Sequence, residues 1–253
     1  MTGSDGHYES WRITVALSLI AQALVMSQQS FHLHMPPHLH GAVGHEPRWP
    51  SVVAGLSVGG LYLALPRNLN IGPQWLLLVI VCILQTAGWI AFRRQDFEMA
   101  QRIGHALSGV LTLSMLISLG LLVHALPTHK EGPAVLLRSA VCLWITNVIV
   151  FASWYWRLDG GGPHKRALRC AHTDGAFLFP QMTLDNQQMG ELCERGWSPR
   201  FVDYLFIAFN TSTALSPTDT AVLSKWAKVL MMIQTLISLT VMVLLAARAV
   251  NIM

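Results

Sequence analysis

The sequence predicts an all-α membrane protein with five to six transmembrane helices and a short re-entrant helix and loop before the last one. Composition sets the class: of the 253 residues, 53% are hydrophobic and only 12% are charged. These values, together with a mean hydropathy of +0.45, lie outside the norms of soluble domains. Apolar runs occupy most of the chain, so we expect one multi-pass membrane domain without a separate soluble one.

The net charge of +4 comes from loops and from the ends of the apolar runs. No basic stripe alternates with aromatic residues, so this charge suits anionic lipid headgroups better than a nucleic acid. We therefore expect the lipid bilayer as a partner, and no nucleic acid. Residues 1–10 carry no basic segment and no A-x-A-like site follows the first apolar run, which argues against a removable signal peptide.

Residues 1–133 form the predicted N-terminal transmembrane region, with three to four spans. In its first apolar run, Thr14, Ser18 and Gln22 recur at every fourth position and form one polar stripe on a helix. This run is either a short span or an amphipathic helix in the membrane interface, and the sequence leaves both open. The apolar runs of the region are residues 11–26, 51–65, 74–92 and 105–126.

A loop with five histidines follows the first apolar run. Imidazole suits zinc, copper and nickel, so His34, His38 and His40 are candidate metal ligands. Their spacing matches neither a helical H-E-x-x-H motif nor a Cys/His finger. The alternatives are a pH-sensing loop and a solvated loop without a specific role. We favour the solvated loop, and we expect no cofactor.

Residues 134–253 form the second predicted region, in which a half-length helix lies between two full-length ones. The segment Phe201–Thr213 is mostly apolar and rich in aromatic residues, but it has only 13 residues, whereas a hydrocarbon core needs about 20. A half-length helix, a polar segment after it and then a full-length helix together predict a re-entrant pore loop. The parts are an outer helix at 134–156, a loop at 157–200, a pore helix and filter-like loop at 201–220, and an inner helix at 222–250.

This second region resembles the pore module of bacterial two-helix-type potassium channels over about residues 134–253. The family's YFSFVTLTTVGYGDI is matched by YLFIAFNTSTALSPTDT, and the S-P-T-D segment also resembles a bacterial group of membrane proteins with an F-S-P-T-D signature. The resemblance implies a homotetramer in the bacterial inner membrane that conducts inorganic ions. Thr211 and Thr213 fall on family threonines, Asp219 on the aspartate that closes the filter, and Ala214, Leu215, Ser216, Pro217 and Thr218 on the T-V-G-Y-G filter.

Further segments carry the same resemblance. In the last helix, AKVLMMIQTLISL is similar to the family's inner helix, and Ser238 falls on its hinge glycine. The segments WYWRLD and GAFLFP resemble those that link the family's outer helix to its pore helix. Gln234 and Ser238 give the last helix a thin polar face, which is either a seam between helices or the lining of an aqueous pathway. We expect the pore-lining role.

The filter-like segment departs from the family at its glycines. Ser216 and Thr218 stand where two glycines allow backbone angles that point successive carbonyls into the pore. Pro217 fixes φ and lacks an N–H, and Ala214 lacks the hydroxyl of the family's innermost site. We therefore expect no four-site carbonyl filter. A weakly selective pore for monovalent cations is the expected function, because a helix C-terminus and a ring of Asp219 carboxylates both favour cations.

Three alternatives stay open. Lys225 or Lys228, at the start of the last helix, supplies the basic ring that an anion-conducting pore needs. A channel-derived scaffold that conducts nothing is the second alternative, because a fold does not by itself imply a function. The third, a metal-dependent membrane enzyme, rests on the His-rich loop alone, and we expect no enzymatic activity.

The outer helix and the loop after it contain four further residues of interest. Asn147 lies mid-helix, where an unpaired amide is costly; it either braces the pore element or forms an ordinary hydrogen bond between helices, which we favour. Tyr155, at the end of the helix, is expected in an interfacial aromatic belt. The loop begins with a tight glycine-rich exit, and it holds Cys170 and Cys193, which can form a disulfide if it faces an oxidising compartment.

The predicted orientation in the membrane contains a conflict. Channel-like topology places the pore loop and the 157–200 loop outside. It then also places the expected loop at 93–104 outside, although Arg93, Arg94 and Arg102 favour the inside. We keep the channel-like topology because several segments support it in the right order.

Overall fold

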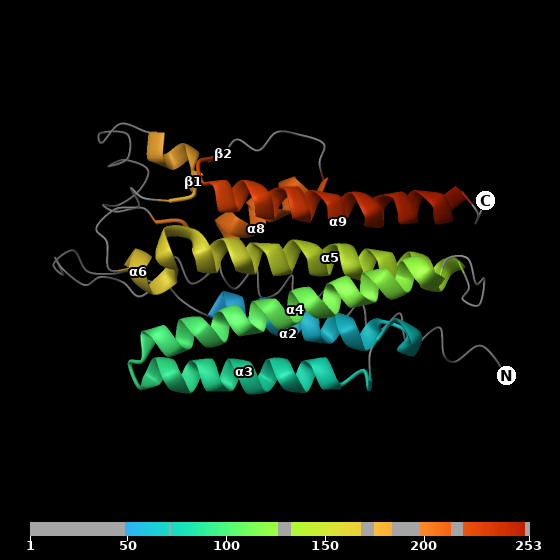
Figure 1. Cartoon of the computed structure of the whole chain (residues 1–253), viewed down its shortest axis with the longest axis horizontal. Coiled ribbons are helices and arrows are strands. Elements are labelled where there is room, and N and C mark those ends of the chain that lie inside the picture. Colours follow the sequence, from blue (N-terminus) through green and yellow to red (C-terminus); the bar gives the residue numbers. More distant parts are fainter. Residues whose placement is uncertain are drawn as a thin grey trace, which may run out of the picture.

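The computed structural model describes residues 49–70, 72–125, 133–167, 175–183, 198–213 and 220–250. The long helices lie side by side, roughly along the longest axis of the molecule (Figure 1). The helices are α2 (Trp49–Ala64), α3 (Leu76–Arg93), α4 (Phe97–Ala125), α5 (Pro133–Leu158), α6 (Pro163–Ala167), α8 (Phe201–Thr213) and α9 (Lys225–Val250). The described residues also form two strands, β1 (Phe177–Leu178) and β2 (Ala221–Val222).

Four helices of the described chain are long and apolar enough to cross a membrane. They are α3, α4, α5 and α9, whose most apolar stretches have mean hydropathies of 2.0 to 2.4. This finding confirms the prediction of an all-α membrane protein. The helix α2 is also apolar but has only 16 residues, and it packs against α3 and α5. The expected span or interfacial helix at residues 11–26 lies outside the described residues.

The helix α5 forms the centre of the bundle, because α2, α4, α8 and α9 all pack against it. In its most apolar stretch 61% of the residues are buried, against 17% in α3 and 22% in α9. Small side chains make this packing close: Ser139, Ala140, Ala152 and Ser153 are all buried, and small residues let transmembrane helices approach one another. The expected outer helix therefore contacts both halves of the bundle.

The turn between α3 and α4 is shorter than the expected loop at 93–104, since α4 begins at Phe97. Gln95 has a φ of 61°. Its N–H and that of Asp96 donate to carbonyls in the last turn of α3, at 3.0 and 3.1 Å. These two hydrogen bonds end α3, with Gln95 as the residue in the left-handed conformation that often follows a helix. Arg102 therefore belongs to a helix and not to a loop.

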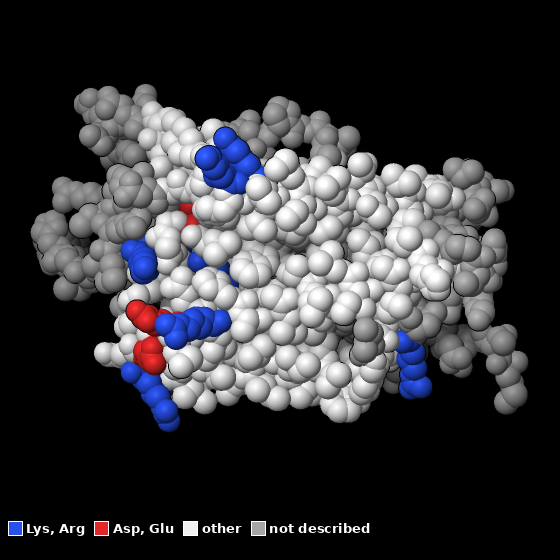
Figure 2. All heavy atoms as spheres, in the orientation of Figure 1, with Lys and Arg blue, Asp and Glu red and all other residues white. Residues whose placement is uncertain are grey.

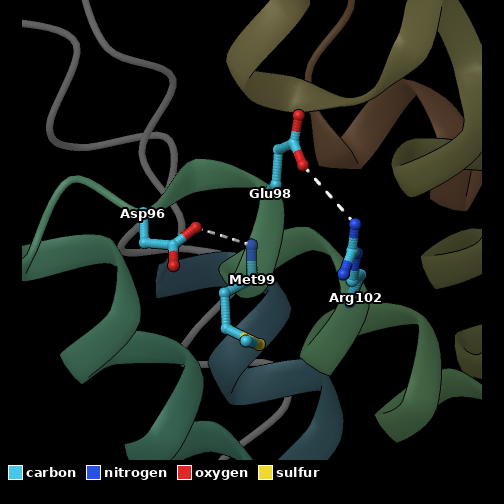
Figure 3. A network of polar contacts seen from close by, with 4 residues as sticks. All are labelled: Asp96, Glu98, Met99 and Arg102. Carbon is cyan, nitrogen blue, oxygen red and sulfur yellow. Dashed lines mark hydrogen bonds and ion pairs between the residues drawn. The ribbon is translucent and has the colours of Figure 1, made fainter.

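Asp96 also caps the start of α4. Its Oδ1 accepts the Met99 backbone N–H at 3.0 Å (Figure 3), which satisfies one of the first N–H groups of the helix that have no partner within it. Glu98 and Arg102 form an ion pair at 3.5 Å on the exposed face of the same turns (Figure 3). The cap explains why α4 begins well before the apolar run that predicted it.

The polar loop after α5 begins with the glycine turn Gly160–Gly162, in which all three residues have positive φ. Just before this turn, Asp159 is fully buried. Its carboxylate accepts the Ala176 N–H at 2.5 Å and the Tyr204 hydroxyl at 2.6 Å. A buried carboxylate needs such donors because its desolvation is otherwise costly. Asp159 thereby joins the end of α5 to the residue before β1 and to the first turns of α8.

The strands β1 and β2 form a two-residue antiparallel pair that the sequence did not predict. Phe177 lies opposite Val222 in this pair, so the segment before α8 is bonded to the segment before α9. A strand of two residues is too short to show the alternation that identifies longer strands. Cys170 and Cys193, the expected disulfide candidates of the same loop, lie outside the described residues.

Replacing Asp96 by alanine removes the cap of α4 and leaves the exposed ion pair in place. We expect the free energy of unfolding to fall by about 1 kcal/mol, the usual cost of losing an N-terminal cap. Thermal unfolding of the purified protein in detergent micelles measures the change. Glu98→Ala is the matched control, since an exposed pair on a helix contributes about 0.5 kcal/mol or less. Equal losses from the two changes contradict the capping role.

Candidate functional site

The helix α8 occupies Phe201–Thr213, the segment expected as a pore helix, with 13 residues against 26 in α5 and in α9. It packs against both of these long helices. One face is buried there, whereas Phe206 and Phe209 on another face are 56% and 46% exposed. The buried residues of α8 are Phe201, Tyr204, Ile207, Ala208, Thr211 and Ser212.

The start of α8 is fixed by Asp203 and by neighbouring aromatic rings. The Arg200 backbone N–H donates to Asp203 Oδ2 at 2.7 Å, and a carboxylate in the first turn suits the positive end of the helix dipole. Burial raises the pKa of the Asp203 carboxyl above its ordinary value, while the Arg200 N–H and charge act in the opposite direction. Phe177 contacts Tyr155 and Tyr204 edge-on, with ring centroids 5.3 and 6.1 Å apart.

The buried amide of Gln234, on α9, holds the last turns of α8. Its Nε2 donates to the Ala208 carbonyl at 2.7 Å and to the Ser212 hydroxyl at 2.8 Å. Its Oε1 accepts the Tyr155 hydroxyl at 2.5 Å. The side chain is 0% exposed, so each of these bonds replaces one that water would otherwise make. One residue of α9 thus connects α5 and α8.

Two further side chains meet the end of α8. The Ser238 hydroxyl donates to the Ser212 carbonyl, one of the last four carbonyls of a helix that lack a partner within it. Asn147 Nδ2 lies 3.4 Å from both Ser212 Oγ and the Gln234 carbonyl, beyond the usual range of N–H···O hydrogen bonds. Asn147, on α5, therefore makes the expected contact between helices, with α8 and with α9. The hydrogen bonds from Gln234 to α8 are shorter than these contacts.

Gln234 and Ser238 do not lie where a pore-lining pair is expected. They are 0% and 1% exposed within the packing of a single chain, whereas a pathway between copies is lined by surfaces that a single chain leaves open. The physical reason is that the end of α8 presents carbonyl and hydroxyl groups without intrahelical partners. Polar side chains of α9 satisfy these groups. The polar face of α9 is thus a polar seam between helices, the other alternative that the sequence left open.

The remaining residues of the expected site fall into two groups. Thr211 and Thr213 lie in the last turn of α8, and their hydroxyls donate to the carbonyls of Ile207 and Asn210, at 2.8 and 2.9 Å. Among the residues that the structure describes, no three His, Cys, Asp or Glu side chains are grouped so that they could hold a metal ion. The expected site residues outside the described ranges are Ala214, Leu215, Ser216, Pro217, Thr218, Asp219, His34, His38 and His40.

Sequence reasoning missed two members of this arrangement. Tyr155, expected in an interfacial belt, is fully buried and donates to Gln234. A tyrosine near the end of an apolar helix gives the same pattern whether its hydroxyl meets headgroups or a buried amide. Ser212 accepts from Gln234, but in the sequence it is only one of several small hydroxyl residues in a row.

The chain matches no family model, and no curated protein or solved structure is similar to it. What the candidate site can do therefore follows from its geometry. A short helix ends where α9 presents Gln234 and Ser238, and its last carbonyls precede residues 214–219. A helix C-terminus carries roughly half a negative elementary charge, so α8 ends at Thr213 with partial negative charge.

Replacing Gln234 by leucine keeps the volume of the side chain nearly unchanged and removes three hydrogen bonds. Because the Tyr155 and Ser212 hydroxyls stay buried without this partner, we expect the free energy of unfolding to fall by about 2 to 4 kcal/mol. Unfolding in a graded series of detergent mixtures, followed by circular dichroism, measures the loss.

The matched control for this change is Thr240→Val on the same helix. Thr240 is exposed, and its hydroxyl donates to the Leu236 carbonyl of its own helix. This substitution should alter the free energy of unfolding by about 0.5 kcal/mol or less. If the two variants lose equal stability, the bonds of Gln234 do not hold α8 in place.

Proposed function

We propose that this protein is an ion-channel-like protein of the bacterial inner membrane, in which four copies form a weakly selective pore for monovalent cations. One observation carries the proposal: α8 is half the length of α9, and its last turns are held by Gln234 and Ser238. A fixed half-length helix followed at once by residues 214–219 corresponds to a pore helix and its loop. In this arrangement α5 is the outer helix and α9 the inner helix.

The sign of the conducted ion follows from the charges at the end of α8. The helix C-terminus contributes partial negative charge, and four copies of Asp219 add a ring of carboxylates of the kind that cation channels use. The Ser216 and Thr218 hydroxyls can accept hydrogen bonds from the water shell of a partly hydrated cation. Without two glycines, no stack of carbonyls replaces that shell, so discrimination between potassium and sodium is weak.

The surface of α9 supports an assembly of several copies. In a single chain only 22% of its most apolar stretch is buried, and Met232, Leu236 and Leu239 are between 54% and 64% exposed. Lipid or a second copy of the chain covers such a face in a membrane. With Gln234 and Ser238 directed at α8, four inner helices present mainly apolar side chains to the axis. An apolar constriction of this kind can gate by dewetting.

An anion-conducting pore is the second candidate, and the position of two lysines favours it. Lys225 and Lys228 lie in the first turn of α9, shortly after the filter-like loop in the chain. In four copies they would form a basic ring near the mouth of the pore. The third alternative is a scaffold in which the loop forms a packed, non-conducting plug. The three differ in which ions cross the membrane.

Purified protein in liposomes, tested separately for potassium, sodium and chloride flux, distinguishes these candidates. We expect comparable potassium and sodium flux, because no carbonyl filter selects between them, and little chloride flux. Chloride flux above cation flux supports the anion pore. If no ion crosses at any pH or lipid composition, the pore proposal is contradicted and the scaffold is favoured.

Asp219→Asn removes the carboxylate ring and preserves the size of the side chain. We expect the reversal potential in a salt gradient to move toward that of chloride, because the ring contributes to charge selectivity. Glu98→Gln is the matched control: it removes a carboxylate whose side chain is 87% exposed on α4, outside the pore region. A reversal potential that moves equally in both variants, or in neither, shows that Asp219 does not set the selectivity.

A further inference from the structure

A pocket of about 510 Å³ lies apart from α8 and α9. It is bounded by the starts of α2 and α4, the ends of α3 and α5, and α6. This is the end of the molecule at which α6 and the α3–α4 turn lie (Figure 1). In Figure 2 the Asp and Glu side chains in view, and most of the Lys and Arg side chains, lie toward the same end, with a basic side chain at the other. Charged side chains of membrane proteins lie at the headgroup level, which places the pocket near the headgroups of one leaflet.

The lining of the pocket is mainly apolar and aromatic, with a small number of polar groups. No Asp or Glu is among its lining residues in the part of the chain that the structure describes. This composition suits a ligand that is largely apolar and carries no positive charge. The aromatic residues are Trp49, Trp89, Phe92, Phe97 and Trp156, and the polar residues are Ser51, Gln85, Gln101, Arg157 and His164.

Two glycines shape the pocket. At Gly104 an added Cβ would overlap the Arg157 guanidinium, so the missing side chain lets that guanidinium lie against α4. At Gly88 an added Cβ would come within 4 Å only of the Ile103 side chain, at 3.5 Å. The pocket therefore reaches the backbone of α3 at Gly88, where an added Cβ would make only ordinary van der Waals contact.

A shallower hollow of about 370 Å³ adjoins the pocket at the α3–α4 turn. The two cavities share Trp89, Phe92 and Phe97, and the hollow adds Arg93 and Gln95. Arg93 Cζ lies 4.4 Å from the centre of the Trp89 ring, so the guanidinium stands over an aromatic wall common to both. The Arg93 side chain thus places a positive charge beside an apolar cavity.

We propose that the pocket and the hollow together bind an anionic phospholipid of the surrounding bilayer, with an acyl chain in the pocket and the phosphate beside Arg93. The volume lies in the range of small-ligand sites, about 300 to 1,000 Å³. Charge complementarity selects the headgroup, because Arg93 and Arg157 line these cavities and, among the described residues, no carboxylate does. Of the nearby carboxylates, Asp96 caps α4 and Glu98 pairs with Arg102.

Native mass spectrometry of the full chain, titrated with dioleoyl phosphatidylglycerol or dioleoyl phosphatidylcholine, tests the headgroup. We expect phosphatidylglycerol to bind more tightly. Arg93→Gln should weaken phosphatidylglycerol binding by roughly fivefold, the effect of one basic residue at an anionic membrane surface. It should weaken phosphatidylcholine binding less, because the choline charge offsets that of the phosphate. Arg94→Gln is the matched control, because it removes the same charge one residue along the chain but lines neither cavity.

Gly88→Leu tests the cavity, since the added side chain fills the pocket from α3 and should remove one tightly bound lipid. Its control is Gly109→Leu on α4, where an added Cβ meets nothing within 4 Å. Size-exclusion chromatography first establishes that both variants fold; if Gly88→Leu does not, the two arginine variants decide. The proposal is overturned if the two lipids bind equally, if Arg93→Gln behaves like Arg94→Gln, or if a folded Gly88→Leu keeps the lipid.

Discussion

The buried amide of Gln234 is the constraint on which the arrangement of α5, α8 and α9 depends. Inside a bilayer no water replaces a lost hydrogen bond, so each polar group must find its partner in the protein. Gln234 finds partners only where Tyr155 of α5 and the last turns of α8 meet at one level of α9. An α8 that slid or tilted would leave at least one of these groups unpaired. The amide therefore fixes where the short helix ends as well as stabilising it.

Hydropathy and length were sufficient to predict the long helices, because the thickness of the hydrocarbon core fixes both quantities. The same comparison located α8, since an apolar run of half the required length is conspicuous beside full-length ones. The start of α4 could not be found in this way. Residues 97–104 are polar enough to resemble a loop, and the cap that makes them helical acts through one hydrogen bond from Met99 to Asp96.

The candidate site was less predictable than the helices. The polar face of α9 was identified, but a polar stripe has the same helical period whether it faces water or another helix. Only the position of α8 decides that Gln234 and Ser238 are enclosed. Asp159 contacts Ala176 and Tyr204, which lie far from it in the sequence. A local sequence pattern could not predict these contacts. The filter-like loop at 214–219 lies outside the described residues, and its chemistry stays a prediction.

The pairing of β1 with β2 also determines the order in which this half of the protein can assemble during synthesis. Phe177 is translated before α8, but its partner Val222 is translated after it. By itself α8 is too short to be retained across a bilayer as a span, and Gln234, which holds its end, is translated later still. The last turns of the short helix therefore acquire these partners only after α9 has left the ribosome. The last transmembrane helix thus completes the docking of α8, whose first turns already have a partner in Asp159 at the end of α5.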